Sequence, residues 1–274
     1  MRLKKKLKQI LRYYLKSLLP EKNFNNLKSI YTKIFPANEK KTDSKLLQYN
    51  ENLFHDLGIN LETSKLTLEK LGKNYSSNVL SWHYHLFAGI SDIFIKHRVP
   101  VKKILEIGTH NGDFANFISK VFPESEIYTI DLPHDDDVFT NSYGRYDEIF
   151  KNEFLLYRSS NLKSENIHFI EMSSSCIVNE FKDIKFDIVW IDGDHVNPQV
   201  TMDIMNTLQL THEQSLICVD DIIKEEFKED YLSNESFQTL TNLEKNNILK
   251  NSFIAKRTYA KQKPLKYVAV SSKM

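Results

Sequence analysis

Cysteine and glycine are scarce in this chain of 274 residues, which has only two cysteines and seven glycines. Cys176 and Cys218 both lie in segments with a buried character, so we expect no disulfide framework and a reducing, cytoplasmic setting. No apolar run approaches the roughly 20 residues that a membrane-spanning helix needs. The basic start of the chain is not followed by an uninterrupted apolar stretch or a small-residue cleavage site, so no signal peptide is expected.

Positive charge is concentrated at one end of the chain, although the formal net charge is only +1. Residues 1–50 contain thirteen Lys or Arg against three acidic residues, which leaves the remainder acidic. Residues 1–19 have a helical period with a leucine-rich face, and Pro20 closes the segment. The other face carries seven basic residues: Arg2, Lys4, Lys5, Lys6, Lys8, Arg12 and Lys16. This pattern predicts an amphipathic helix that either binds an anionic membrane surface peripherally or docks on protein.

The remaining chain predicts an α/β domain of residues 76–274 behind a basic helical extension and linker of residues 1–75. Residues 37–50 are polar and predict a linker, whereas Leu53–Leu71 and Ser81–His97 predict helices. Short apolar segments then predict strands at Lys103–Ile107, Glu126–Asp131, Ile167–Glu171, Phe186–Asp192, Ser215–Asp220, Phe253–Tyr259 and Lys266–Ser271. Helical segments separate these strands, one of them starting with Asn197 as cap and Pro198 as first residue. The alternation predicts a Rossmann-like, mostly parallel sheet with helices on both faces and an antiparallel C-terminal strand pair.

The segment from Ile104 to Phe114 predicts a strand, a glycine-bearing turn and a helix. Ligands of open α/β sheets bind beside such turns, outside the carboxyl ends of the strands. Gly108 lets the backbone turn sharply, and Gly112 removes a Cβ where the helix meets the strand. Asp131 ends the next strand, where a carboxylate can accept both hydroxyls of a ribose. A dinucleotide site would need G-x-G-x-x-G, which the spacing does not fit, and a turn without ligand is the other alternative.

This segment resembles the first motif of class I S-adenosylmethionine (SAM)-dependent methyltransferases. That motif has an acidic residue before a glycine-rich turn, and a second acid ends the next strand. His110 departs from it, because it replaces the usual middle glycine. The resemblance implies that the cofactor contacts Glu106, Gly108, Thr109, Gly112, Asp131, Met172 and Ser173.

Acidic residues also end the fourth and fifth predicted strands: Asp192 and Asp194 on one, Asp220 and Asp221 on the other. If these strands are neighbours, the carboxylates meet at the same edge as the glycine turn. Grouped carboxylates repel one another unless a cation or protons neutralise them, and oxygen-only ligands favour a hard ion such as Mg²⁺ or Mn²⁺. The alternative is that these residues only cap the following helices.

The two strand ends resemble those of the metal-dependent sugar O-methyltransferases of macrolide biosynthesis and the related rhamnosyl and cephalosporin-pathway enzymes, over residues 100–222. The resemblance implies that Asp192, Asp220 and Asp221 hold Mg²⁺ or Mn²⁺. It also implies that His195 is the general base that takes the proton of an acceptor hydroxyl, in a sugar or glycan.

The sequence leaves other functions open. One is a metal-independent small-molecule methyltransferase or an oxygenase of the same fold, and another is a non-catalytic, membrane-associated protein that retains the fold. A nucleic-acid partner is not expected, and a homo-oligomer stays open. Residues 82–85 could line a sugar site, but packing of their helix against the sheet is favoured. Residues 133–137 favour an acidic surface loop.

Overall fold

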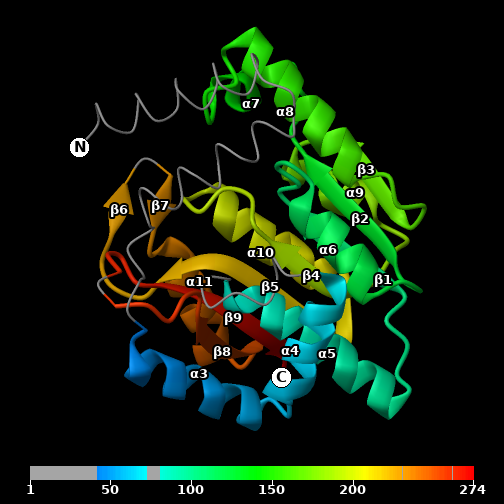
Figure 1. Cartoon of the computed structure of the whole chain (residues 1–274). Coiled ribbons are helices and arrows are strands. Elements are labelled where there is room, and N and C mark those ends of the chain that lie inside the picture. The colour runs from blue at the N-terminus through cyan, green and yellow to red at the C-terminus, as the bar shows by residue number, and fades with distance from the viewer. Residues whose placement is uncertain (1–41, 73–80, 230, 261) are drawn as a thin grey trace, which may run out of the picture. The chain divides into compact units, whose positions relative to one another are not determined.

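The computed structural model describes residues 42–72, 81–229, 231–260 and 262–274 (Figure 1). Residues 42–274 form one compact unit. The expected boundary after residue 75 falls inside this unit, and the division into an extension and a domain stays a prediction. The amphipathic helix expected at residues 1–19 lies outside the described residues, so its membrane contact also stays a prediction. Of the described helices, none is long and apolar enough to cross a membrane.

A seven-stranded sheet forms the centre of the unit, with the strand order β3-β2-β1-β4-β5-β9-β8. In this order the strands are Ile167–Glu171, Glu126–Asp131, Lys103–Ile107, Phe186–Ile191, Thr211–Ile223, Lys266–Lys273 and Leu249–Ala255. The first five are parallel, and β9 is antiparallel to both of its neighbours. The predicted Rossmann-like fold class is confirmed, including the antiparallel C-terminal pair.

Helices cover both faces of this sheet (Figure 1). They are α3 (Ser44–Asp56), α4 (Leu61–Leu71), α5 (Trp82–His97), α6 (Asp113–Val121), α7 (Asp137–Asn141), α8 (Glu148–Asn161), α9 (Ile177–Glu180), α10 (Gln199–Gln209) and α11 (Glu235–Lys245), with a short 3-10 turn at Ser174–Cys176. A small hairpin of β6 (Lys228–Glu229) and β7 (Leu232–Ser233) follows β5. The helices α7 and α8 are inserted between β2 and β3, and Figure 1 shows them together above one end of the sheet.

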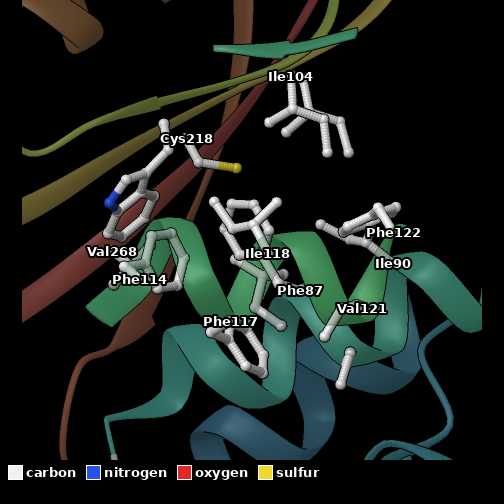
Figure 2. Close-up of a cluster of buried hydrophobic side chains, with 14 of the residues drawn as sticks. Phe87, Ile90, Ile104, Phe114, Phe117, Ile118, Val121, Phe122, Cys218 and Val268 are labelled. Atoms are coloured by element: carbon white, nitrogen blue, oxygen red, sulfur yellow. The ribbon is translucent and has the colours of Figure 1, made fainter. Parts of the chain in front are cut away.

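Two buried hydrophobic clusters divide the core between the faces, because strand side chains alternate from one face to the other. In β1, Ile104 joins the cluster under α5 and α6, whereas Leu105 joins the cluster under α10 and α11. Figure 2 shows the first cluster, where Phe87 of α5 and Phe114 and Phe117 of α6 gather close to the sheet. Burial of large side chains on this face fixes α5 and α6 next to the strands that carry the candidate site.

Four local predictions are wrong. The linker expected at residues 37–50 already contains the start of α3 at Ser44, because Asp43 caps this helix through its side chain. Strand β8 begins four residues before the expected Phe253 and ends at Ala255, since its edge position leaves polar residues half exposed and hides the strand pattern. Pro198 is the N-cap of α10, without the side-chain bond expected from Asn197. Both cysteines are free, but Cys176 is exposed.

Candidate active site

The pleat of the parallel strands brings the predicted acidic residues to one face of the sheet. Ile104 and Trp190 belong to the core cluster under α5 and α6, so Glu106 and Asp192, two residues further along, point to the same side. The same alternation takes Asp220 to this side, because Cys218 belongs to that cluster. Glu106, Asp192 and Asp220 therefore share both the carboxyl edge of the sheet and one of its faces.

The predicted cofactor loop comprises residues 108–112 after β1, and Gly108 joins it to the end of β4. Its φ angle of 99° lies in the region that favours glycine, and an added Cβ would overlap the backbone carbonyl of Asp192. The N–H of Asp192 donates to the carbonyl of Ile107 at 2.8 Å, which continues the ladder between the two strands. The loop after β1 and the acidic segment after β4 are thus in direct backbone contact.

The rest of the loop turns through two more residues with positive φ. Gly112, with φ 75°, is the N-cap of α6, and an added Cβ would be crowded by Asn161 and Leu162. His110, with φ 49°, occupies the position of the usual middle glycine and donates its backbone N–H to Asp131 Oδ2 at 2.8 Å. Its ring lies 5.3 Å from the ring of Tyr143 in the inserted segment. The histidine therefore keeps the turn and adds an aromatic contact to it.

Glu106 is buried under the loop, with 1% of its surface exposed. Thr129 donates its hydroxyl to Glu106 Oε2, and the Thr129 hydroxyl lies 2.6 Å from that of Thr109. Burial raises the pKa of Glu106 well above its ordinary value, although the hydrogen bond from Thr129 acts in the opposite direction. This carboxyl group therefore supports the loop from beneath through a chain of hydroxyls.

Asp131 presents its carboxylate at the end of β2. Besides His110, the N–H of Leu132 donates to it at 2.8 Å, and Arg158 Nη1 lies 4.0 Å from Oδ2. Burial raises the pKa of Asp131, whereas the two backbone hydrogen bonds and Arg158 lower it. The buried Arg158 is held by Glu171 at 2.9 Å, so the position of Asp131 is fixed from two sides.

The expected adenine-side residues follow β3 as predicted. The N–H of Met172 donates to the carbonyl of Asp131 at 2.8 Å, which places Met172 directly beside the ribose-binding candidate. Ser173 caps the 3-10 turn by accepting a hydrogen bond from Ser175 N at 3.3 Å. Both residues thus lie at the same sheet edge as the cofactor loop.

The carboxylates of Asp220 and Asp221 form ion pairs with two lysine side chains. Lys256 Nζ bonds to Asp220 Oδ2 and lies 2.5 Å from Asp221 Oδ1, and Lys266 Nζ lies 2.6 Å from Asp221 Oδ2. Although burial raises the pKa of Asp221, the two lysines hold it well below its ordinary range. The acidic cluster is therefore paired with two ammonium groups.

Asp192 and His195 form a second pair beside this cluster. His195 Nε2 lies 3.5 Å from Asp192 Oδ1, and the backbone carbonyl of His195 accepts a hydrogen bond from Ser233 at 3.0 Å. Burial and the nearby Asp220 raise the pKa of Asp192 to about 6. Burial lowers the pKa of His195, but the contact with Asp192 outweighs it and the net shift is upward. The imidazole is thus oriented by a carboxylate, as a general base requires.

A divalent ion does not fit this arrangement. Mg²⁺ takes oxygen ligands in a near-octahedral shell, yet both oxygens of Asp221 and one of Asp220 already contact ammonium groups. The other oxygen, Asp220 Oδ1, is buried without a hydrogen-bond partner among the described residues. Within that part of the chain, no group of three or more His, Cys, Asp or Glu residues is arranged to hold a metal. The predicted ligands converge, but a lysine lies where they meet.

Lys256 and Lys266 were not predicted as site residues. Strand β8 runs parallel to β5, and β9 runs antiparallel to both, so the end of β8 and the start of β9 share the carboxyl edge. The signal in the sequence was a lysine directly after the apolar run Phe253–Ala255, and the misplaced strand boundary put that lysine inside the strand. Arg158 gave no sequence signal, because it lies within the inserted helix α8.

The aromatic residues at the start of α5 belong to the core. Trp82 is buried and packs edge-on against Phe54 at 5.2 Å, and its ring N–H donates to the hydroxyl of Thr258. His83 is buried against Trp190, and burial lowers its pKa to about 3. The favoured packing role of residues 82–85 is confirmed for these two side chains. Further along, Asp136 caps α7 in the acidic segment after β2.

This chain has weak similarity to solved structures and matches one family model over part of its length. Among curated proteins, none matches the sequence. The structure of the O-methyltransferase TomG from Streptomyces achromogenes in complex with SAM is 13% identical in sequence, with a TM-score of 0.47. The similarity covers 94% of this chain and 100% of TomG. A caffeoyl-CoA O-methyltransferase candidate from Staphylococcus aureus is 16% identical with a TM-score of 0.49, over 83% of this chain and 98% of its own. Residues 105–222 match the family model described as a methyltransferase domain, and the matched range includes the loop after β1 and the carboxylate-bearing ends of β4 and β5.

Proposed function

We propose that this protein is a SAM-dependent O-methyltransferase that acts on a hydroxyl group. The substrate class that we propose is a sugar or glycan. One observation carries the proposal: the glycine loop after β1 contacts the segment after β4 that holds the Asp192–His195 pair. A cofactor held by the loop and an acceptor beside the imidazole would therefore meet at one edge of the sheet.

The cofactor would be held by the loop and by the end of β2. Gly108 allows close approach of the backbone, and Asp131 can accept the two ribose hydroxyls because its position is fixed by backbone N–H groups. Met172 and Ser173 would flank the adenine. The positive charge of a sulfonium group would in turn favour the charged forms of the nearby Glu106 and Asp192, whose pKa values burial raises.

The transfer needs one proton acceptor and no redox partner. The acceptor oxygen would attack the methyl carbon in line with the sulfonium, the S–CH₃ bond would break, and S-adenosylhomocysteine would leave with the bonding electron pair. His195 would take the hydroxyl proton, and Asp192 would stabilise the imidazolium that forms. Mg²⁺ or Mn²⁺ on Asp192, Asp220 and Asp221 is the alternative activation, and it requires Lys256 to leave its present contacts.

Methyl transfer from labelled SAM to a glycan extract of the source cells tests this proposal, in parallel samples with and without EDTA. We expect label in the glycan fraction and an equal amount of S-adenosylhomocysteine. A panel of small phenols and catechols separates a small-molecule methyltransferase from a glycan enzyme. SAM binding without turnover on any acceptor would favour the non-catalytic alternative instead.

A further inference from the structure

We propose that Lys256 is the resident cation of the carboxylate cluster, so that the wild-type site works without a divalent metal ion and becomes a metal site only when this lysine is removed. The proposal deepens the proposed function and rests on it for the meaning of the site. Its physical part, the choice between an ammonium group and a divalent ion, can be tested without any turnover.

The ammonium group lies at the point where a shared metal would lie. Lys256 Nζ contacts one oxygen of Asp220 and one of Asp221, and its side chain is only 15% exposed. Lys266 takes the second oxygen of Asp221 at 2.6 Å. Two carboxylates are thus balanced by two ammonium groups, and a divalent ion would have to displace a buried, paired charge.

The backbone of Lys256 is held by hydrogen bonds through both its N–H and its carbonyl group, unlike that of a mobile surface lysine. Its N–H donates to the carbonyl of Lys266 at 2.8 Å. Its carbonyl accepts from the N–H of Trp82 at 2.9 Å and from the hydroxyl of Ser81 at 3.2 Å. The start of α5 and the start of β9 therefore fix the backbone of Lys256. From this position its side chain extends to Asp220 and Asp221.

The carboxylates are arranged for a single shared partner. Neighbouring side chains of a regular strand point to opposite faces, yet Asp220 and Asp221 both contact Lys256. This is possible because the pairing of β5 with β9 shifts register between Val219 and Ile222, and Asp221 has a φ of 53°. A non-glycine residue in this conformation costs energy, and such strain is typical of functional sites. Here it turns two consecutive carboxylates toward one lysine.

This lysine can also serve the reaction. An ammonium group has three N–H donors, and among the described residues two carboxylates use it. The remaining donor can stabilise the acceptor oxygen while His195, on the neighbouring strand end, takes its proton. That is the electrostatic part of what a bound divalent ion would supply.

Binding of Mn²⁺, followed by electron paramagnetic resonance of the free ion, tests the proposal on the full chain. We expect no stoichiometric binding to the wild type, and one ion bound per chain by Lys256→Met, which frees one oxygen each of Asp220 and Asp221 while Lys266 keeps its contact with Asp221. The double variant Lys256→Met/Asp220→Asn should lose that ion again. Lys250→Met, an exposed lysine on the same strand β8, is the matched control and should behave like the wild type.

The wild-type titration decides the question even if Lys256→Met does not fold. Stoichiometric Mn²⁺ binding by the wild type that Asp220→Asn abolishes would overturn the proposal, because it would show that the lysine yields to the metal. Failure of a folded Lys256→Met protein to gain a site would also count against it. Neither result bears on SAM binding or on methyl transfer in EDTA, which are measured separately and together test the proposed function.

Discussion

Two pairs of acidic residues at the same sheet edge are neutralised in different ways. Glu106 and Asp131, at the ends of β1 and β2, receive hydrogen bonds from a threonine hydroxyl and from backbone N–H groups. Asp220 and Asp221, at the end of β5, are paired with lysine side chains. Burial raises the pKa of both carboxyl groups of the first pair, and the cation Arg158 lies 4.0 Å from Asp131, whereas the second pair already holds two ammonium groups in direct contact.

This contrast divides the proposed reaction between the two ends of the site. A sulfonium cofactor belongs at the end with Glu106 and Asp131, because its positive charge would favour the charged forms of these buried carboxyl groups. An acceptor oxygen that loses a proton belongs at the end where ammonium groups can stabilise it. The Asp192–His195 pair follows β4, which lies between β1 and β5 in the strand order, so this pair lies between the two ends and can serve the transfer between them.

The largest expected effect falls on this dividing pair. His195→Ala should lower methyl transfer by about 10²–10⁴-fold, the usual contribution of a general base, while SAM affinity stays unchanged. His212→Ala is the control, because His212 pairs with Asp187 near the opposite edge of the sheet. Turnover near that of the wild type would show that His195 only orders the loop after β4.

The close contact between the loop after β1 and the backbone of Asp192 after β4 can be broken at Gly108. An added Cβ brings a positive-φ strain and an overlap with the Asp192 carbonyl. Gly144→Ala is a matched control. Gly144 also has a positive φ, 84°, but the atom nearest to a Cβ added there is 4.0 Å away. We expect Gly108→Ala to lower the free energy of unfolding by about 1–3 kcal/mol more than the control in urea denaturation, because only it overpacks. Equal losses in both variants would contradict the close contact of loop and strand.

The charge left at the cofactor end can be removed at Asp131. Asp131→Ala should weaken SAM binding by about 1.5–3 kcal/mol, the cost of a charge-assisted hydrogen bond, in calorimetry on a folded variant. Asp135→Ala changes an exposed carboxylate four residues later and should leave the affinity unchanged. If both variants bind SAM like the wild type, the ribose is held elsewhere.

The smallest effect concerns the buried carboxyl group beneath the loop. Burial raises the pKa of Glu106 in the folded chain, so the stability linked to its proton is present at low pH and lost as the pH rises through that raised value. Glu106→Gln should therefore lose less thermal stability than the wild type between about pH 5 and pH 8. The exposed Glu124→Gln should follow the wild type, and identical pH profiles for all three proteins would contradict a raised pKa.

The sequence predicted one side of this comparison better than the other, for a physical reason. The partners of Glu106 and Asp131 lie 23 and 21 residues away, within the same strand–turn–helix unit and its next strand. Strands β1, β2 and β3 have the predicted bounds because each is a short apolar run with turn residues on both sides. A local pattern therefore contained both the acids and their surroundings.

The partners of Asp220 and Asp221 lie 35 to 45 residues away, on strands whose order the local pattern does not determine. The sequence predicted that a cation or protons neutralise the carboxylates, and Mg²⁺ or Mn²⁺ was the expected ion. It could not predict that the polar edge strand β8 ends at Ala255 and delivers Lys256 to the same edge. Tertiary pairing of β8 with β9, rather than any motif, supplies this charge.

Calorimetric titration of SAM into the wild-type chain in EDTA is the most direct test of the central claim, that the loop after β1 is a cofactor site independent of a metal ion. The account predicts saturable binding of one SAM per chain, unchanged when Mg²⁺ replaces EDTA. Absence of saturable binding by the folded protein, or binding that appears only with Mg²⁺, would contradict it.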